Sequence, residues 1–246
     1  MLRFGPAASL ALSSAALCML ALAPFGWRVG WWPYGFGFYR LIPVSGFVAA
    51  VGVTLGVWTL VQSRLQLGLR SYAMLFAAIP LGAILVYVPL QYSYTRSILP
   101  PIHDITTDTD NPPKFRAVLD ARAAERANSV DHRDPHLAQL QKSAYPDVAP
   151  LIISLPLARA FNEALQVAKS MHGWAIIASD PEEGRIEASQ QSRWFRFTDD
   201  IVIRIAGDGA RTRIDMRSTS RQGRSDYGVN AARIRAFMGA LRRRIG

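Results

Sequence analysis

The sequence predicts an α+β protein in which three N-terminal transmembrane helices precede a small antiparallel four-stranded sheet flanked by helices. Three segments near the N-terminus contain no charged residue: they lie between Arg3 and Arg28, between Arg40 and Arg64, and between Arg70 and Arg96. Each holds the roughly 20 apolar residues that cross a bilayer. Further along, a helical pattern, four short strand patterns and a second helical pattern follow in that order, as in an antiparallel sheet with helices on one face.

Composition divides the chain into two parts of different character. Hydrophobic residues make up 50% of the 246 residues, which is too apolar for an ordinary soluble domain of this length. All 18 acidic residues follow Arg96, together with 22 of the 28 basic residues, so the net charge of residues 97–246 is +4. The basic residues of this part adjoin acidic ones, and we therefore expect no nucleic acid as a partner.

The membrane region is predicted to comprise residues 1–96, with transmembrane helices at about 4–25, 41–63 and 71–95. The first apolar run exceeds the 7 to 15 residues of a typical signal peptide, and two more runs follow, so we expect it to be retained. None of the three runs contains an ionisable side chain of the kind that transporters place in the bilayer. Transport is therefore disfavoured as the function.

The second apolar run contains Gly52 and Gly56 in a GxxxG pattern, which lets two helices approach closely. We favour packing of these glycines against the other two helices of the same chain. A homo-oligomer formed through Gly52 and Gly56 is the alternative.

The orientation of the membrane region decides where residues 97–246 lie. The flanking arginines are divided almost equally between the two sides, so their count alone does not decide it. The short, positively charged N-terminus before a long apolar run resembles a start that stays in the cytoplasm. With three spans, residues 97–246 would then lie outside the cytoplasm.

Residues 97–155 are predicted to form a loop-rich arm with one helix. The stretch SILPPIHDITTDTDNPPKF is rich in proline, aspartate and threonine, and a helix is expected after Pro113. Prolines at 146, 150 and 156 exclude a helix interior from the segment that follows. This arm is expected to wrap around the core of the domain.

Residues 156–246 are predicted to form the α+β core. A helix begins at Leu157, and strands are expected in WAIIAS, GRIEASQQ, DDIVIRI and ARTRIDMRS, the last two joined by a hairpin turn at residues 207–209. On one face of that hairpin, Arg204 and Asp215 are expected to pair across the strands, with isoleucines on the other face.

The last predicted helix has Ile234, Phe237 and Leu241 on one apolar stripe. Asp226 or Asn230 is expected as its N-cap, because short polar side chains accept the free backbone N–H groups of a first helical turn.

Several motifs resemble a known family. PPIHDITTD, YPDVAP, GRIEAS, FTDDIVIRI and DMRSTSRQGRSDYGVNAARIRAF are similar, in the same order, to motifs of the bacterial family called domain of unknown function 1499. The resemblance covers residues from about 97 to 246. It implies an N-terminal membrane anchor, because some members of the family have one. Related plastid proteins imply that residues 97–246 lie outside the cytoplasm, which here means the periplasmic side of a bacterial inner membrane. The resemblance implies no activity and no catalytic residue.

The segment RSTSRQGRSDYGVN is the principal candidate site, as a place that binds an anion. Guanidinium groups bind carboxylate or phosphate in a bidentate manner, and a helix N-terminus beside them adds positive potential. The candidate residues are Arg217, Ser220, Arg221, Arg224, Asp226 and Asn230. The alternative is that these arginines pair with aspartates of the same domain, at 199, 200, 215 and 226, and lock a strand to a helix.

The expected function is that of a non-enzymatic domain of the cell envelope that binds a protein or an anionic lipid. A hydrolase is the alternative, with a site where His103 and Asp104 of the arm meet the arginine segment, and with Asp199 and Asp200 as further candidates. Asp199 and Asp200 are neighbours on a predicted strand, so they point to opposite faces and are poorly placed to act as a pair. We expect no metal, because the aspartates after His103 lack the glycine and terminal glutamate of a calcium loop. We expect no cofactor, because the sequence has no glycine-rich phosphate-binding loop.

Overall fold

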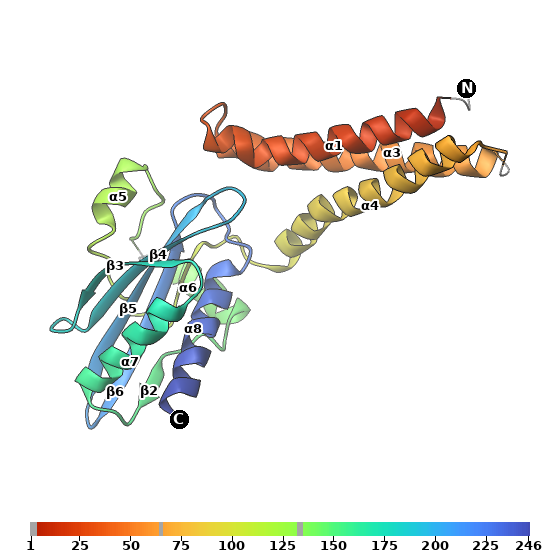
Figure 1. Ribbon diagram of the computed structural model, residues 1–246. Helices are drawn as coiled ribbons and strands as arrows, with labels where there is room; N and C mark the ends of the chain where they lie inside the picture. Colours follow the sequence, from red (N-terminus) through yellow and green to blue (C-terminus); the bar gives the residue numbers. More distant parts are fainter. Residues whose placement is uncertain (1–3, 64–65, 132–134) are drawn as a thin grey trace. The chain divides into compact units, whose positions relative to one another are not determined.

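The protein folds as two compact units, Met1–Ser97 and Ile98–Gly246 (Figure 1). The computed structural model describes residues 4–63, 66–131 and 135–246. The first unit is entirely helical, and the second is an antiparallel sheet with helices, so the predicted α+β class is confirmed.

The first unit contains three helices that are long and apolar enough to cross a membrane, at Gly5–Arg28, Tyr34–Gln62 and Leu69–Ile98. The second of these combines a helical turn, a short π-helix and a long α-helix. The elements are α1 (Gly5–Arg28), α2 (Tyr34–Phe36), η1 (Gly37–Leu41), α3 (Ile42–Gln62) and α4 (Leu69–Ile98).

Many large apolar side chains of this unit are exposed, and many small residues are buried. Phe47 and Phe76 are 71% and 84% exposed, whereas Ser9, Ser13 and Ala49 are fully buried. This is the reverse of a water-soluble helical bundle, and it fits helices whose solvent is lipid, where small residues let backbones approach closely.

Serines and glycines make the close contacts between these helices. The hydroxyl of Ser9 donates to the carbonyl oxygen of Gly52 at 2.8 Å, and Gly56 packs so closely that a Cβ there would lie 2.6 Å from Ser9 Oγ and 2.9 Å from Ile79 Cγ1. Both glycines are buried against helices of the same chain. A homo-oligomer through Gly52 and Gly56 would have to displace these contacts.

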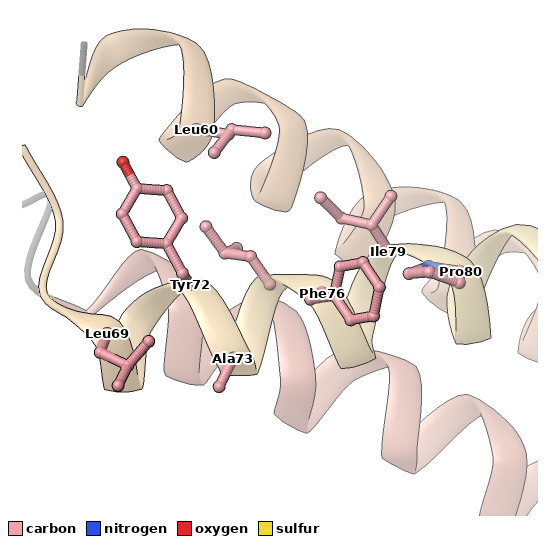
Figure 2. Close-up of a pocket in the computed structure, with 8 residues that line it drawn as sticks. Leu60, Leu69, Tyr72, Ala73, Phe76, Ile79 and Pro80 are labelled. Carbon is pink, nitrogen blue, oxygen red and sulfur yellow. The ribbon is translucent and has the colours of Figure 1, made fainter. Parts of the chain in front are cut away.

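A pocket of about 450 Å³ opens between α3 and α4 near the ends of the two helices (Figure 2). Its lining is apolar except for the hydroxyl of Tyr72, as expected for a recess filled by hydrocarbon. The lining residues are Leu60, Leu69, Tyr72, Ala73, Leu75, Phe76, Ile79 and Pro80.

The second unit is built on a six-stranded antiparallel sheet with the order β1-β6-β5-β4-β3, in which β2 also pairs with β6. The strands are β1 (Asp104–Thr106), β2 (Leu151–Ile153), β3 (Trp174–Asp180), β4 (Arg185–Gln191), β5 (Thr198–Asp208) and β6 (Arg211–Ser220). The four strands predicted from the sequence are β3 to β6. The prediction of four strands was wrong in number, because the arm contributes β1 and β2, which lie one after the other along the same edge of β6.

The arm also carries two short helices where one was expected. The predicted helix after Pro113 is confined to α5 (Leu119–Ala124), because the residues before it form a segment without regular secondary structure and a turn. Helix α6 (Pro135–Ala144) follows. The arm therefore supplies both edge strands and covering helices to the sheet.

One face of the sheet is apolar and covered by helices α7 (Leu157–Ser170) and α8 (Val229–Ile245), which lie side by side (Figure 1). Fully buried residues of β5 and β6, such as Ile203 and Met216, face each other in register beneath these helices. Phe237 of α8 stacks on Trp174 with ring centroids 5.7 Å apart. The opposite face of the sheet is polar, and the candidate site residues are divided between this face and the N-terminal end of α8.

Candidate functional site

The polar face of the sheet, opposite α7 and α8, is lined by charged side chains that are nevertheless buried. Antiparallel register places Asp200 and Arg204 of β5 on the same face as Asp215 and Arg217 of β6. The arm covers this face, and its Phe115 and Val118 pack against Val202 of β5 in a small apolar cluster. We call this surface the charged face.

Asp200 is the most completely bonded carboxylate of the charged face. It is fully buried, and Arg221 donates to its two oxygens in a bidentate pair, with both N–O distances 2.8 Å. Arg122 of α5 donates at 2.6 Å and Ser189 of β4 at 2.6 Å. Burial alone raises the pKa of Asp200, but the hydrogen bonds from Arg221, Ser189 and Arg122 outweigh it, so the pKa lies below its ordinary value. Arg221 is thus held inside the domain, and it also contacts Glu125 at 2.6 Å.

Arg217 is occupied in the same way by the arm. Its Nε donates to Asp104 Oδ1 at 2.9 Å and its Nη2 to the other oxygen of Asp104. Nη2 also donates to the carbonyl oxygen of Val130 at 2.6 Å, and the guanidinium lies over the ring of Phe115, 5.3 Å from its centroid. Arg217 is 3% exposed. Its role in the structure is to fasten the arm to β6.

The predicted cross-strand pair of Arg204 and Asp215 is present, with an Nη2–Oδ2 distance of 2.9 Å. Arg213 shares Asp215, with an Nε–Oδ2 distance of 3.0 Å, and both arginines also bind Asp108 of the arm at 3.0 Å. For Asp108, burial raises the pKa, but backbone hydrogen bonds and the two arginines outweigh it and lower the pKa overall.

The N-terminal end of α8 forms a second polar cluster, on the helix-covered side of the sheet. The helix begins at Val229, after Gly228 in a left-handed conformation with φ +82°. The prediction that Asp226 or Asn230 is the N-cap residue is wrong, because Gly228 holds that position. The Asp226 side chain nevertheless accepts the backbone N–H of Gly228 at 2.9 Å and of Asn230 at 2.7 Å. Asn230 lies inside the first turn and is not the cap. Burial raises the pKa of Asp226, and the backbone hydrogen bonds offset this only in part.

Asn230 ties the helix to the sheet and to the arm. Its amide donates to the carbonyl oxygen of His103 at 2.9 Å and to Ser220 Oγ at 3.1 Å, and its oxygen accepts from Ser218 at 2.6 Å. Arg233, one turn further along α8, binds Asp199 at 2.6 Å. Asp199 and Asp200 therefore lie on opposite faces, each with its own arginine.

Of the six residues of the principal candidate site, five are buried and only Arg224 is exposed. Arg217, Ser220, Arg221, Asp226 and Asn230 all bond within the domain. Arg224 forms no ion pair with any residue that the structure describes. The guanidinium groups of Arg217 and Arg221 are thus already bound bidentately by carboxylates, which leaves Arg224 as the candidate able to meet a ligand.

Arg224 has exposed arginines as neighbours. Arg221 N–H donates to the carbonyl oxygen of Thr198 at 2.9 Å, and Asn128 N–H donates to the carbonyl oxygen of Arg221 at 2.7 Å. These bonds bring the segment after β6 beside the β4–β5 loop and the segment after α5. Four arginines at this end of the sheet are exposed, and we call them the basic end: Arg126, Arg193, Arg196 and Arg224.

The residues of the alternative hydrolase site do not form a catalytic pair. Asp104 is bound by Arg217, and the carbonyl oxygen of His103 accepts the N–H of Ser220 at 3.0 Å. The His103 side chain makes no hydrogen bond or ion pair with another described residue. Across residues 4–63, 66–131 and 135–246, no group of three or more His, Cys, Asp or Glu side chains could hold a metal ion.

Two parts of this arrangement were missed from the sequence. Glu125 of the arm reaches Arg221 across 96 positions of the chain, and Arg122 reaches Asp200 across 78, so no local pattern could have indicated them. The β4–β5 loop did carry a signal in the sequence: SRWFRF places aromatic residues between arginines at a predicted turn between two strands.

Comparison with known proteins supports the resemblance noted in the sequence. A family model described as "Protein of unknown function (DUF1499)" matches residues 104–241, which is more than half of the chain. Neither the curated proteins nor the solved structures compared with the chain include a match.

Proposed function

The chain belongs to the DUF1499 family of proteins of unknown function, and from that premise we propose that it is a membrane-anchored, non-enzymatic binding domain for an anionic partner. The basic end is the observation that carries this proposal. Its four arginines are exposed and lie on three neighbouring segments, while the buried arginines beneath them are bound by carboxylates. Exposed guanidinium groups on a fixed support are suited to bind carboxylate or phosphate.

The buried charges support a binding function more than a catalytic one. A general base needs a free lone pair within reach of a substrate proton. Asp104, Asp200 and Asp215 are instead bonded to arginines beneath the arm. Of these groups, Asp200 fastens the segments that carry Arg126 and Arg224 to the sheet through Arg122 and Arg221, so that binding an anion there costs less conformational entropy.

We further propose that the second unit lies on the periplasmic side of a bacterial inner membrane. The three apolar helices support membrane anchoring. The side of the membrane is inferred from the short positive N-terminus followed by an odd number of spans. A partner at that place would be a component of the cell envelope, either a protein or an anionic lipid.

Binding of a soluble polyanion by the full-length protein in detergent tests the proposal, with heparin as the probe. We compare wild type with Arg126→Gln/Arg224→Gln, which removes two charges from the basic end. The Kd should rise about tenfold, because two exposed ion pairs of roughly 0.7 kcal/mol each together amount to about one power of ten.

The matched control is Arg242→Gln/Arg243→Gln, which removes two exposed charges from the C-terminal end of α8. This helix has 17 residues, so its C-terminal arginines lie about 20 Å from its first residue, Val229. Equal weakening by both variants would mean that the polyanion responds only to total charge, and the proposed binding surface would be wrong.

A further inference from the structure

The β4–β5 loop, residues 192–197, holds a tryptophan in an exposed position on a rigid turn. Ser192 N–H donates to the carbonyl oxygen of Phe197 at 2.9 Å, and Arg196 N–H donates to that of Ser192 at 3.1 Å. Phe195 is 4% exposed and stacks on Phe197, with ring centroids 5.0 Å apart. Between these anchors, Trp194 is 52% exposed.

The neighbours of Trp194 define the chemistry of this surface. Arg193 and Arg196 are both exposed, and Arg196 adopts a left-handed conformation with φ +54°. A non-glycine residue pays an energetic cost in that conformation, so the tight turn is held by the bonds around it. The result is one large aromatic ring flanked by two cations, with the loop fixed underneath by the phenylalanine stack.

The chain that leaves α4 enters the sheet at the same end as this loop. Helix α4, the third apolar span, ends at Ile98, and β1 begins at Asp104 beside Thr219 of β6. The five residues between them allow a reach of at most about 20 Å. Ser220, at the end of β6, pairs with Asp199, next to the start of β5 where the loop ends. The chain therefore enters the sheet at the end that carries the loop.

We propose that the β4–β5 loop binds the surface of an anionic bilayer, with Trp194 at the level of the lipid headgroups and Arg193 and Arg196 on their phosphate groups. This inference rests on the proposed function and names its partner as lipid. Tryptophan prefers the interface because its ring is apolar and its N–H can still hydrogen-bond. Arginine binds phosphate in bidentate geometry, and basic residues are attracted to anionic lipid within a Debye length.

Hydroxyl-radical footprinting of the full-length protein in nanodiscs tests the inference, because it reports the solvent exposure of individual side chains. We compare discs of phosphatidylglycerol, discs of phosphatidylcholine, and detergent. Oxidation of Trp194 should be about threefold slower in phosphatidylglycerol than in phosphatidylcholine or detergent, since the anionic surface draws the loop inward. Trp174, which is partly buried and stacks on Phe237 at the helix-covered face of the sheet, is the internal reference and should not change.

Two variants identify the cause of the protection. In Arg193→Gln/Arg196→Gln, Trp194 should no longer be protected from oxidation in phosphatidylglycerol. In Arg242→Gln/Arg243→Gln, which changes the far end of α8, Trp194 should remain protected. An unchanged Trp174 in each variant shows that the fold is intact. Equal oxidation of Trp194 in all three environments, or protection that appears only after a protein extract is added, would overturn the inference.

The two proposals can fail separately. If Trp194 remains unprotected while heparin still binds and depends on Arg126 and Arg224, the lipid is not the partner but the binding domain stands. If heparin binding is also insensitive to the basic end, the proposed function fails as well.

Discussion

At Asp200, four hydrogen bonds from three side chains converge on one buried carboxylate. Removing an ion from water has a large cost, and the arginines that surround Asp200 are themselves buried. Such a cluster contributes little net stability over an apolar one, but it becomes strongly unfavourable if one partner is lost. The cluster therefore determines how the arm, the sheet and the segment after β6 pack against one another.

Asp200→Asn should destabilise the second unit by roughly 3–5 kcal/mol, because it leaves the buried Arg122 without its negative partner and Arg221 with only the partly exposed Glu125. The measurement is thermal unfolding of the full-length protein in detergent. The control is Asp147→Asn, which breaks a bidentate pair with Arg235 in which both side chains are about half exposed, and which should cost less than about 1 kcal/mol. Equal effects of the two variants would contradict the structural role given to Asp200.

The stability of the folded protein should depend on pH through the ionisation of Asp200. The pKa of Asp200 is lowered in the folded protein from its ordinary value of 3.8, so its stabilising contribution is complete above about pH 4 and is lost as pH falls through the folded pKa. The difference in melting temperature between wild type and Asp200→Asn should shrink as pH decreases from 5 toward roughly 2. A difference that stays constant over this range would show that the charge of Asp200 is not what matters.

Asp226 should have the opposite effect on how stability depends on pH. Burial raises the pKa of Asp226 in the folded protein above its ordinary value of 3.8, so the ionised carboxylate opposes folding. The folded state therefore becomes more stable as pH falls through the raised pKa toward 3.8, where the carboxylate takes up a proton. In that window wild type should gain stability relative to Asp226→Ala, as followed by melting temperature in detergent. No change in the difference between the two proteins would contradict the raised pKa.

At the residue scale, sequence reasoning found most members of the site but not its arrangement. Arg221 and Asp200 could be proposed as partners because basic and acidic residues flank the same two strands. The predicted convergence of Arg217 and Arg221 on a ligand could not be tested from the sequence, because the arm that supplies Asp104 and Arg122 lies far away along the chain. Long-range pairing leaves no periodic pattern.

Among the elements, β6 holds the second unit together, since it pairs with β5 along its whole length and with β1 and β2 along its other edge. Its alternation, and that of β3 to β5, is long enough to be recognised in the sequence. Strands β1 and β2 have three residues each, which is too short for a two-residue period to be distinguished from a loop. Their pairing is determined by the tertiary structure.

Gly56→Leu should separate the helices of the membrane unit. A Cβ at this position would lie 2.6 Å from Ser9 Oγ and 2.9 Å from Ile79 Cγ1, so α1 and α4 would both have to move away from α3. Overpacking of this kind costs about 1–3 kcal/mol. Thermal aggregation of the full-length protein in detergent measures the loss, and Gly68→Leu is the control, because nothing lies within 4 Å of a Cβ there. Equal aggregation temperatures for the two variants would show that the α1–α3–α4 contacts are not made.

For the molecule as a whole, the two units use opposite packing rules. Small residues are buried in the first, and isoleucine, methionine and phenylalanine are buried in the second. Hydropathy alone predicted the first unit, because an uncharged apolar run of about 20 residues is typical of a helix that crosses a bilayer. Predicting the second unit also required the alternation of apolar and polar residues along its strands.

Reporter fusions after Gly246 should place the second unit outside the cytoplasm. A phosphatase that folds only outside the cytoplasm should be active at this position, and green fluorescent protein, which folds in the cytoplasm, should be dark when exported in unfolded form. The protein should also stay with the membrane pellet after alkaline extraction, since three apolar helices hold it there. The reverse pattern of reporter signals would show that the orientation inferred from the N-terminus and the three spans is wrong.

The short link between α4 and β1 also has a mechanical consequence. Any pull that separates the second unit from the lipid is transmitted through residues 99–103 to the first bonds that fasten the chain to the fold. These are Asp226 N–H to the carbonyl oxygen of Ile102 at 3.1 Å, followed by the bonds to the His103 carbonyl oxygen. Behind them lies the ion pair of Arg217 with Asp104. Under tension the domain would open from the tether inward, with that ion pair resisting the peeling of β1 from β6.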